Sequence, residues 1–194
     1  MPGSLDLAEC IAQMRERVPD AIVTNGAGNF SAWVHRFWRW HEYPTQLAPT
    51  SGAMGYGLSA AIAGKVVHPE RTVVCFAGDG DFLMSGQDLA TAAQYDLPIV
   101  VLLVNNGMYG TIRMHQERHY PGRVVGTDLT NPDFAAFARS FGAHGETVTQ
   151  TPEFADALER ALASGTSALI ELQIDPDAIN PRTTLTKIRA DALK

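Results

Sequence analysis

The sequence predicts an α/β protein built on a doubly wound, mainly parallel six-stranded sheet with helices on both faces. Two apolar runs support this prediction, at residues 72–77 and 99–104. Both are short, rich in β-branched residues and free of polar alternation, as expected for strands buried on both faces of a parallel sheet. Residues 84–95 between them are long enough for the single crossover helix that parallel neighbours require.

The other elements follow from shorter patterns along the chain. Apolar residues at helical spacing predict amphipathic helices, and short apolar runs bounded by turn residues predict strands. The expected helices are 5–18, 132–141 and 152–163, and the expected strands are 21–24, 46–50, one that ends at Val148, and 168–174. Asn131 is expected to cap the helix at 132–141. Residues 175–194 are expected to form an extended C-terminal arm that reaches over a neighbouring subunit.

Ser31 is expected to cap a helix in which aromatic residues are interleaved with basic ones. The aromatic residues are Trp33, Phe37, Trp38 and Trp40, and the basic ones are His35, Arg36 and Arg39. Aromatic rings among cations can stack nucleic-acid bases, but they also pack in cores and subunit interfaces. Because the chain is acidic overall, we expect a subunit interface and therefore a homo-oligomer.

Length and composition describe an ordinary globular protein. The 194 residues are enough for a single domain, 1–194, with a sizeable core. A net charge of −6 argues against a surface for nucleic acid or an anionic membrane. No apolar run approaches the roughly 18 residues of a membrane span, and no signal peptide opens the sequence. Cys10 and Cys75 lack metal-ligand spacing, and Cys75 is expected to be a reduced thiol in a buried strand. A cytoplasmic protein is expected.

Polar and glycine residues follow both apolar runs, where two neighbouring strands of the sheet should end. Gly78, Asp79 and Gly80 follow the first run and Asn106 follows the second, so they should lie together at the edge where open α/β sheets bind ligands. Asp79, Asn106 and the backbone carbonyl of Met108 offer the hard oxygen ligands that suit Mg²⁺. The glycines allow close approach of a phosphate to the backbone. The pattern predicts a magnesium-bridged diphosphate.

The spacing of these residues resembles a known motif. GDG at 78–80, a gap of 24 residues and then NN at 105–106 is similar to the diphosphate-anchoring motif of thiamine diphosphate-dependent enzymes. The segment GAMGYGLSAAIA, beginning at Gly52, resembles the one that receives the aminopyrimidine ring in acetolactate synthase-like enzymes. The resemblance implies that the Gly52 carbonyl and the Met54 N–H bind that ring, and that the Met54 side chain wedges between pyrimidine and thiazolium. A helix start packed through small residues is the alternative, but it does not account for Met54.

The resemblance implies a set of cofactor-binding residues, three of which also bind the metal. The set is Gly52, Met54, Gly78, Asp79, Gly80, Asp81, Phe82, Asn106, Met108 and Tyr109, with Asp79, Asn106 and Met108 as ligands of Mg²⁺. Asp81 departs from the family, which usually has a small neutral residue there. A carboxylate beside a diphosphate repels it unless the carboxylate is turned away or balanced by the metal.

Three other features leave alternatives open. Asn29, in a glycine-bearing turn, either touches substrate or diphosphate or is a plain turn residue. Tyr109 and Thr111 are expected near the diphosphate or in a lid. His115 and His119 have the spacing to share a metal, but no third ligand is evident, so a solvated or lid-facing helix is expected.

The resemblance covers residues 21–174 and implies the C-terminal domain of the acetolactate synthase and benzoylformate decarboxylase group, which decarboxylates or ligates 2-keto acids. In that group the glutamate that activates the pyrimidine belongs to a second, N-terminal domain. This chain has no room for that domain, so we expect no catalytic residue in it and no activity from it alone.

Several origins stay open. The chain is either an excised domain, with an artificial start at residues 1–4, or a natural small subunit, as in two-chain sulfopyruvate or phosphonopyruvate decarboxylases. A non-catalytic thiamine diphosphate-binding module is a further alternative. A Rossmann dehydrogenase is excluded because the loop at 26–31 lacks the third glycine of the dinucleotide fingerprint.

Overall fold

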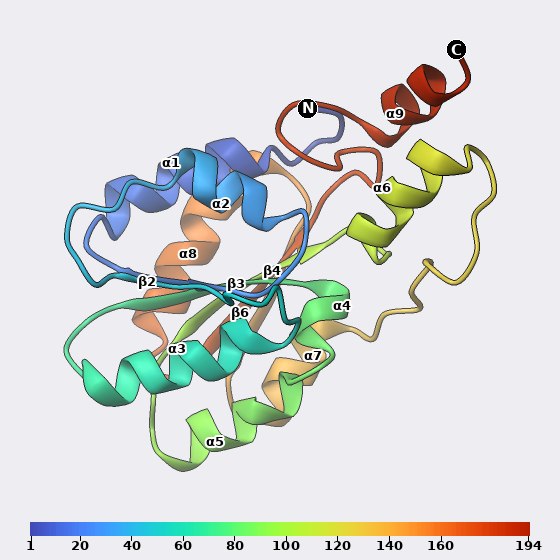
Figure 1. Ribbon diagram of the computed structural model, residues 1–194. Helices are drawn as coiled ribbons and strands as arrows, with labels where there is room; N and C mark the ends of the chain where they lie inside the picture. Colours follow the sequence, from blue (N-terminus) through green and yellow to red (C-terminus); the bar gives the residue numbers. More distant parts are fainter.

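The computed structural model describes all 194 residues and contains a sheet of six strands between two layers of helices (Figure 1). The strands are β1 (Ile22–Asn25), β2 (Gln46–Leu47), β3 (Val73–Gly78), β4 (Val100–Asn105), β5 (His144–Val148) and β6 (Ala168–Gln173). Their order is β2-β1-β3-β4-β6-β5, and every pair is parallel. The predicted fold class is confirmed, with a sheet that is parallel throughout.

The helices cover both faces of the sheet. They are α1 (Leu7–Arg17), α2 (Ser31–Phe37), α3 (Tyr56–Val67), α4 (Asp79–Phe82), α5 (Leu89–Gln94), α6 (Gly110–His119), α7 (Phe134–Ser140), α8 (Phe154–Ala163) and α9 (Leu185–Ala192), with 3₁₀ turns η1 (Gly86–Asp88) and η2 (Thr151–Glu153). Helices α1, α2 and α8 pack on one face, and α3, α5 and α7 pack on the other (Figure 1). None of the helices is long and apolar enough to cross a membrane.

Strand β3 shows why the apolar runs do not alternate with polar residues. Val74 and Phe76 point into the core beneath α1, α2 and α8, whereas Val73, Cys75 and Ala77 point into the core beneath α3, α5 and α7. Successive side chains of a strand face opposite sides. Because both sides are covered by helices, every position of β3 is buried and apolar or small.

The strand order places a ligand crevice at a defined edge of the sheet. Strand β1 pairs with β2 on one side and with β3 on the other, so the chain reverses its direction across the sheet between β1 and β3. Open α/β sheets bind ligands outside the carboxyl ends of the strands at such a switch point. The turn after β3 begins at Gly78, which is in register with Val104 near the end of β4. The turns after β1, β3 and β4 therefore meet at one edge.

The connection between β3 and β4 differs from the single helix expected at 84–95. It consists of the short helix α4, the turn η1 and the six-residue helix α5. The chain leaves helical geometry at Ser85, which has φ −142°. Gly86 packs so closely on Phe82 that a Cβ atom at Gly86 would lie 2.8 Å from the ring. This contact holds the break between the two helices, and the sequence spacing did not predict it.

The aromatic segment also differs from the prediction. Ser31 is the first residue of α2 and does not cap it: the N-cap position is Phe30, and the Ser31 hydroxyl donates to the Gly28 carbonyl at 2.7 Å. The helix ends at Phe37, before Trp38 and Trp40. Trp33 and Trp38 are buried in the core of their own chain. The expectation that these two rings form a subunit interface is therefore wrong, because α1 and the sheet already cover them.

The C-terminal segment is not an extended arm. Residues Leu185–Ala192 form helix α9, which packs against α6 of the same chain (Figure 1). Glu117 of α6, which is fully buried, accepts hydrogen bonds from the Arg189 guanidinium, one of them at 2.7 Å from Nε. Arg113 also donates to Glu117, at 3.1 Å. Both cations hold the pKa of the Glu117 carboxyl well below its usual value, at about 2.

Candidate functional site

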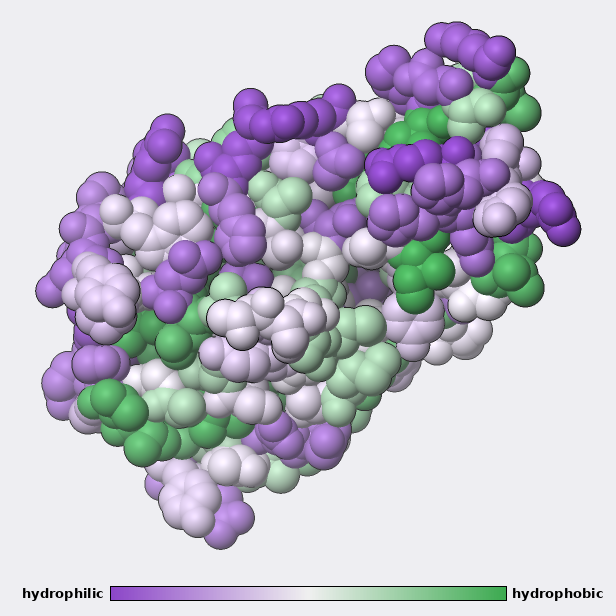
Figure 2. Space-filling view, viewed as in Figure 1, coloured by the Kyte–Doolittle hydropathy of each residue, from purple (hydrophilic) through white to green (hydrophobic).

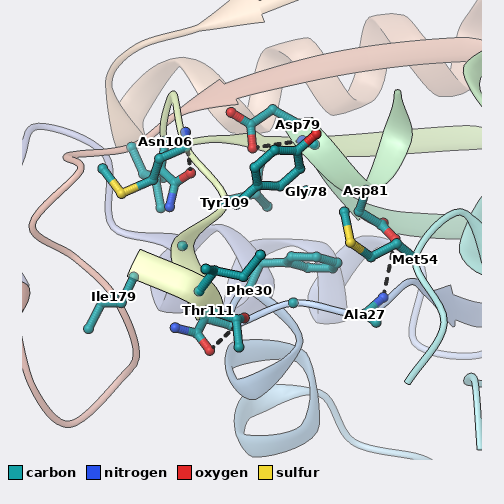
Figure 3. A pocket seen from close by; sticks show the side chains of 18 of the residues that line it. Ala27, Phe30, Met54, Gly78, Asp79, Asp81, Asn106, Tyr109, Thr111 and Ile179 are labelled. Atoms are coloured by element: carbon teal, nitrogen blue, oxygen red, sulfur yellow. Dashed lines mark hydrogen bonds between the residues drawn. The ribbon is translucent and has the colours of Figure 1, made fainter. Parts of the chain in front are cut away.

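A cavity of about 430 Å³ opens at the carboxyl edge of the sheet (Figure 3). It is lined by the turns after β1, β3 and β4, by the loop before α3 and by the chain just after β6. Nine of the ten predicted cofactor-binding residues line it: Gly52, Met54, Gly78, Asp79, Gly80, Asp81, Asn106, Met108 and Tyr109. Segments that are up to about 150 residues apart in sequence, such as 27–30 and 174–179, thus share one cavity.

Phe82 is the exception among the predicted residues. Its side chain is buried in the core beneath α5 and α7, where it packs edge-to-face against Phe134 and Phe137 at centroid distances of 5.8 and 5.9 Å. One turn of α4 is enough to direct it away from the cavity that Asp79 and Asp81 line. The Phe82 side chain therefore packs in the core and does not line the cavity.

Asp79 is held from several sides. Its Oδ1 accepts the N–H of Gly80 at 3.0 Å, and its Oδ2 accepts the N–H of Gly107 at 2.9 Å and the amide of Asn131 at 2.8 Å. The residue is 3% exposed. Burial raises the pKa of the Asp79 carboxyl, and the hydrogen bonds from Asn131, Gly80 and Gly107 oppose that shift. Three donors fix the orientation of the carboxylate before any ligand arrives.

The loop after β4 is also fixed. The side-chain oxygen of Asn106 accepts the N–H of Met108 at 3.2 Å, and Gly107 between them has φ +70°, a conformation that favours glycine. Met108 forms an antiparallel bridge with Asp128. Asn106 and Met108 are thus presented to the cavity by a closed turn that is anchored to a second segment.

Tyr109 lies against the turn that follows β3. A Cβ atom at Gly80 would lie 2.5 Å from the Tyr109 ring, so a larger residue at this position would require the ring to move. Figure 3 shows Tyr109 on the same side of the cavity as Asp79. The second glycine of the GDG motif therefore allows Tyr109 to pack closely against this turn.

Asp81 joins two loops of the cavity. Its Oδ1 accepts the N–H of Gly55 at 2.8 Å and the N–H of Ala27 at 3.2 Å. Its Oδ2 is buried and has no hydrogen-bond partner. Burial raises the pKa of the Asp81 carboxyl to about 6, against the effect of the backbone donors. The carboxylate is turned toward these backbone groups. Turning away is one of the two conditions named above, the other being balance by the metal, under which a diphosphate can bind beside this carboxylate.

Met54 stands at the mouth of the cavity. Its side chain is 36% exposed and lies close to Asp81 in Figure 3. The loop that carries it turns through Gly52 and Gly55, with φ of +65° and +82°. The Gly55 carbonyl accepts the Ser85 hydroxyl at 2.8 Å, while its N–H donates to Asp81. Both polar groups of the Gly55 peptide unit are therefore held by the segment after β3.

Asn29 is part of the cavity wall and contacts α6. Its side-chain oxygen accepts the Thr111 hydroxyl at 3.0 Å, and both residues line the cavity (Figure 3). His115 and His119 stack on each other along α6, with centroids 6.2 Å apart, but do not line the cavity. The structure contains no group of three or more His, Cys, Asp or Glu side chains that could hold a metal.

The sequence did not single out the polar residues behind Asp79. Asn105 is the first residue of the NN pair, and Asn131 was expected to be a helix cap. The N-cap of α7 is Asp133, which accepts the Ala136 N–H at 2.8 Å. Asn131 instead donates to Asp79. Only the meeting of two distant segments reveals this role, because an Asn immediately before an expected helix is an ordinary cap signal.

Comparisons with known proteins agree with this geometry. Residues 26–172 match the family model described as "Thiamine pyrophosphate enzyme, C-terminal TPP binding domain". The chain is 37% identical over 174 residues to the acetolactate synthase large subunit of Parasynechococcus marenigrum, covering 89% of this chain and 28% of that protein. It is 36% identical over 169 residues to the acetolactate synthase isozyme 2 large subunit of Escherichia coli, covering 85% and 31%.

A solved structure shares the fold. The thiamine diphosphate-dependent 4-hydroxybenzoylformate decarboxylase of Rhodococcus jostii superposes with a TM-score of 0.83 at 31% identity, over 90% of this chain and 33% of that one. The chain thus spans about a third or less of the length of these relatives. It belongs to the thiamine pyrophosphate enzyme family and carries the C-terminal, thiamine pyrophosphate-binding domain of acetolactate synthase-like enzymes.

Proposed function

We propose that this chain binds the magnesium-diphosphate end of thiamine diphosphate as part of an enzyme that decarboxylates or ligates 2-keto acids. The observation that carries the proposal is the convergence of Asp79, Asn106 and Met108 on one cavity whose lining contains no Lys, Arg or His. A diphosphate brings several negative charges, and Asp79 and Asp81 add to them. A divalent cation is therefore needed to make binding favourable.

The donor set fits magnesium. Asp79 offers a carboxylate, Asn106 an amide oxygen and Met108 a backbone carbonyl, all of them hard oxygen ligands. Mg²⁺ is typically held by one or two carboxylates together with phosphate oxygens and water, not by a cage made only of protein groups. No cluster of three or more acidic, Cys or His side chains is present. A single carboxylate ligand is nevertheless enough to bind Mg²⁺ in this way, because phosphate and water supply the other ligands.

The rest of the cavity suits the remainder of the cofactor. Gly52 has nothing within 4 Å of the position where a Cβ atom would lie, so its backbone is open to a ring. Met54, a flexible apolar side chain, can fill the irregular space between two rings. Asn29 lines the cavity and is available to the diphosphate or the substrate. Apolar residues such as Phe30, Ile112 and Ile179 limit water around the reacting groups.

The acid that activates the cofactor belongs to another domain. When bound, thiamine diphosphate supplies a nucleophilic carbon for attack on the keto carbon, and this carbon must first lose its proton. No glutamate lines the cavity. Because the chain spans about a third or less of its relatives, we assign the pyrimidine-binding domain and its glutamate to a longer polypeptide or to a second chain. The sequence identity with acetolactate synthase large subunits favours a longer polypeptide over a two-chain decarboxylase.

The same proposal includes self-association and a cytoplasmic location. Met54, Tyr56, Leu83 and Met84 are exposed apolar side chains on the loop before α3, on α3 itself and just after α4, and apolar surface borders the hollow beneath α6 in Figure 2. Such patches mark interfaces, and a partner domain placed here would close the cavity. Cys10 and Cys75 are buried free thiols, consistent with a reducing compartment.

Titration calorimetry tests the proposal. Thiamine diphosphate is titrated into the chain with Mg²⁺ and again with EDTA. Heat of binding is expected only with Mg²⁺. Binding of equal strength in both titrations would contradict the magnesium-bridged site. No binding in either titration would contradict the proposal that this chain alone binds the cofactor.

A further inference from the structure

The amide of Asn131 lies behind Asp79 at the point where three segments meet. Its Nδ2 donates to the Asp79 carboxylate at 2.8 Å and to the Asn105 side-chain oxygen at 3.0 Å. Asp79 follows β3, Asn105 ends β4, and Asn131 comes from the chain before α7. One amide therefore ties the ends of two neighbouring strands together on the side of Asp79 that carries Oδ2.

The orientation of this amide is fixed by a chain of acceptors. Glu171 on β6 accepts from the amide of Asn105 at 2.6 Å, and an ionised carboxylate can only accept. The nitrogen of Asn105 must therefore face Glu171, which leaves its oxygen facing Asn131 and the N–H of Gly107, at 2.9 Å. Asn131 then faces two acceptors, the oxygens of Asn105 and Asp79. Only its NH₂ group can serve both.

The same arrangement leaves one atom unpaired. The side-chain oxygen of Asn131 is buried and has no hydrogen-bond partner. Leaving a buried acceptor unsatisfied costs free energy, and such atoms in native structures call for an explanation. An apolar side chain would avoid this cost but would leave Asp79 and Asn105 with one donor fewer each, so the unpaired oxygen alone does not account for an amide at position 131. Two donors directed at Asp79 and Asn105 do account for it.

We propose that Asn131 is a positioning residue for the metal ligand Asp79, with Glu171 and Asn105 setting its orientation. The inference rests on the magnesium-binding role proposed above. Asn131 does not line the cavity. It holds Oδ2 of Asp79 beside the Gly107 N–H, so that the remaining lone pairs of the carboxylate stay directed at the cavity. Residues that orient metal ligands in this way typically change metal affinity by 10–100-fold when they are replaced.

Three variants separate positioning from general loosening of the segment. Asn131→Ala removes both donors. Asn131→Asp keeps the shape but places a second carboxylate against Asp79. Asp133→Ala is the control: it deletes the N-cap of α7, two residues away, and is expected to lower stability without touching Asp79.

The readout is the affinity for Mn²⁺, used as a paramagnetic substitute for Mg²⁺, in the presence of thiamine diphosphate, followed by electron paramagnetic resonance. The melting temperature of the metal-free chain is measured beside it. Asn131→Ala is expected to bind Mn²⁺ about 10–100-fold more weakly, Asn131→Asp at least as weakly, and Asp133→Ala within about twofold of wild type. Melting temperatures of Asn131→Ala and Asp133→Ala are expected to be similar.

An Asn131→Ala variant that binds Mn²⁺ as tightly as wild type would overturn this inference but not the proposed function. So would an Asp133→Ala variant that loses as much affinity for Mn²⁺ as Asn131→Ala does. Wild-type chain without cofactor-dependent Mn²⁺ binding would overturn the proposed function, and this inference with it.

Discussion

The Asp81 carboxylate accepts the backbone N–H of Gly55 at 2.8 Å and so connects the turn after β3 to the loop that carries Met54. The same oxygen accepts the N–H of Ala27 in the turn after β1. A residue that stands where the family usually has a small neutral one is thus the shared acceptor for two other loops of the cavity. Its negative charge is unfavourable for a diphosphate, but its oxygen is part of the framework of the site.

Replacing Asp81 should separate these two effects. Asp81→Ala leaves the partly buried N–H groups of Gly55 and Ala27 without their charged acceptor, and we expect a loss of about 1–3 kcal/mol in the free energy of unfolding. Asp81→Asn keeps an acceptor oxygen and removes a buried charge, so its stability should equal or exceed that of wild type. Urea unfolding at pH 7 measures both. Equal destabilisation by the two variants would show that the charge, and not the acceptor, is what the fold requires.

The sequence was most informative where local pattern and chemistry coincide. Residues 72–77 and 99–104 became β3 and β4 because unbroken apolar runs have few other places in an α/β fold. Asp79 and Asn106 were found because strand ends in a parallel sheet share one edge, so spacing along the chain translates into proximity. The resemblance to a known motif added Gly52 and Met54, which no periodicity would have selected.

Where the sequence failed, tertiary contacts decided the outcome. The Phe82 side chain packs on Phe134 and Phe137 of α7, and the GDG pattern contains no sign of these contacts. The burial of Trp33 depends on α1 lying across α2, which the pattern around Ser31 does not contain. Asn131 acts on Asp79 across 52 residues of sequence, and α9 packs on α6 through Glu117 and Arg189, which are 72 residues apart.

Removing Arg189 should release α9 from α6. In Arg189→Gln the fully buried Glu117 keeps Arg113 and the Gly122 N–H as partners but loses the guanidinium. We expect a loss of about 1–3 kcal/mol and faster amide hydrogen exchange in residues 185–192. Lys187→Gln removes an exposed pair with Asp191 on the same helix and should change stability by less than about 1 kcal/mol. Unchanged exchange in Arg189→Gln would show that apolar contacts alone hold the helix.

The same ion pair predicts a dependence on pH. The pKa of Glu117 falls from 4.5 to about 2 in the folded chain, first because of Arg189 and then Gly122 and Arg113. A carboxyl with a depressed folded pKa contributes stability above its unfolded pKa and loses it as the pH falls toward the folded one. Exchange protection of α9 should therefore decrease between about pH 4.5 and pH 2. The Glu117→Gln variant should lack this step, and a variant that retains it would assign the step to another group.

Loss of either proposed metal ligand should abolish the dependence of thiamine diphosphate binding on Mg²⁺. Asp79→Ala and Asn106→Ala are each expected to weaken thiamine diphosphate binding in Mg²⁺ by more than about 100-fold, since a ligand matters at least as much as the residues that orient it. Asp156→Ala on the exposed face of α8 is the control for a lost carboxylate. Titration calorimetry measures all three. Affinity that stays magnesium-dependent in both ligand variants would place the metal elsewhere.

The isolated chain should not turn over a 2-keto acid. The carbon that attacks the keto group must first be deprotonated, and in the proposed assembly a glutamate of the partner domain enables this step. A general acid–base group supplies about 10²–10⁴-fold, and positioning in a closed site supplies more. The cavity of this chain contains Asp79 and Asn106, which we propose as anchors, and Met54, which we propose as the wedge, but no glutamate. It is also open where Met54 is exposed, so water would compete for the backbone groups that bind the ring.

The measurement is pyruvate consumption with thiamine diphosphate and Mg²⁺, for the chain alone and after adding the N-terminal domain of a related acetolactate synthase. We expect activity only in the mixture, and none when Asp79→Ala replaces the wild-type chain. Turnover by the chain alone at the rate of the mixture would mean that the activating acid lies within these 194 residues.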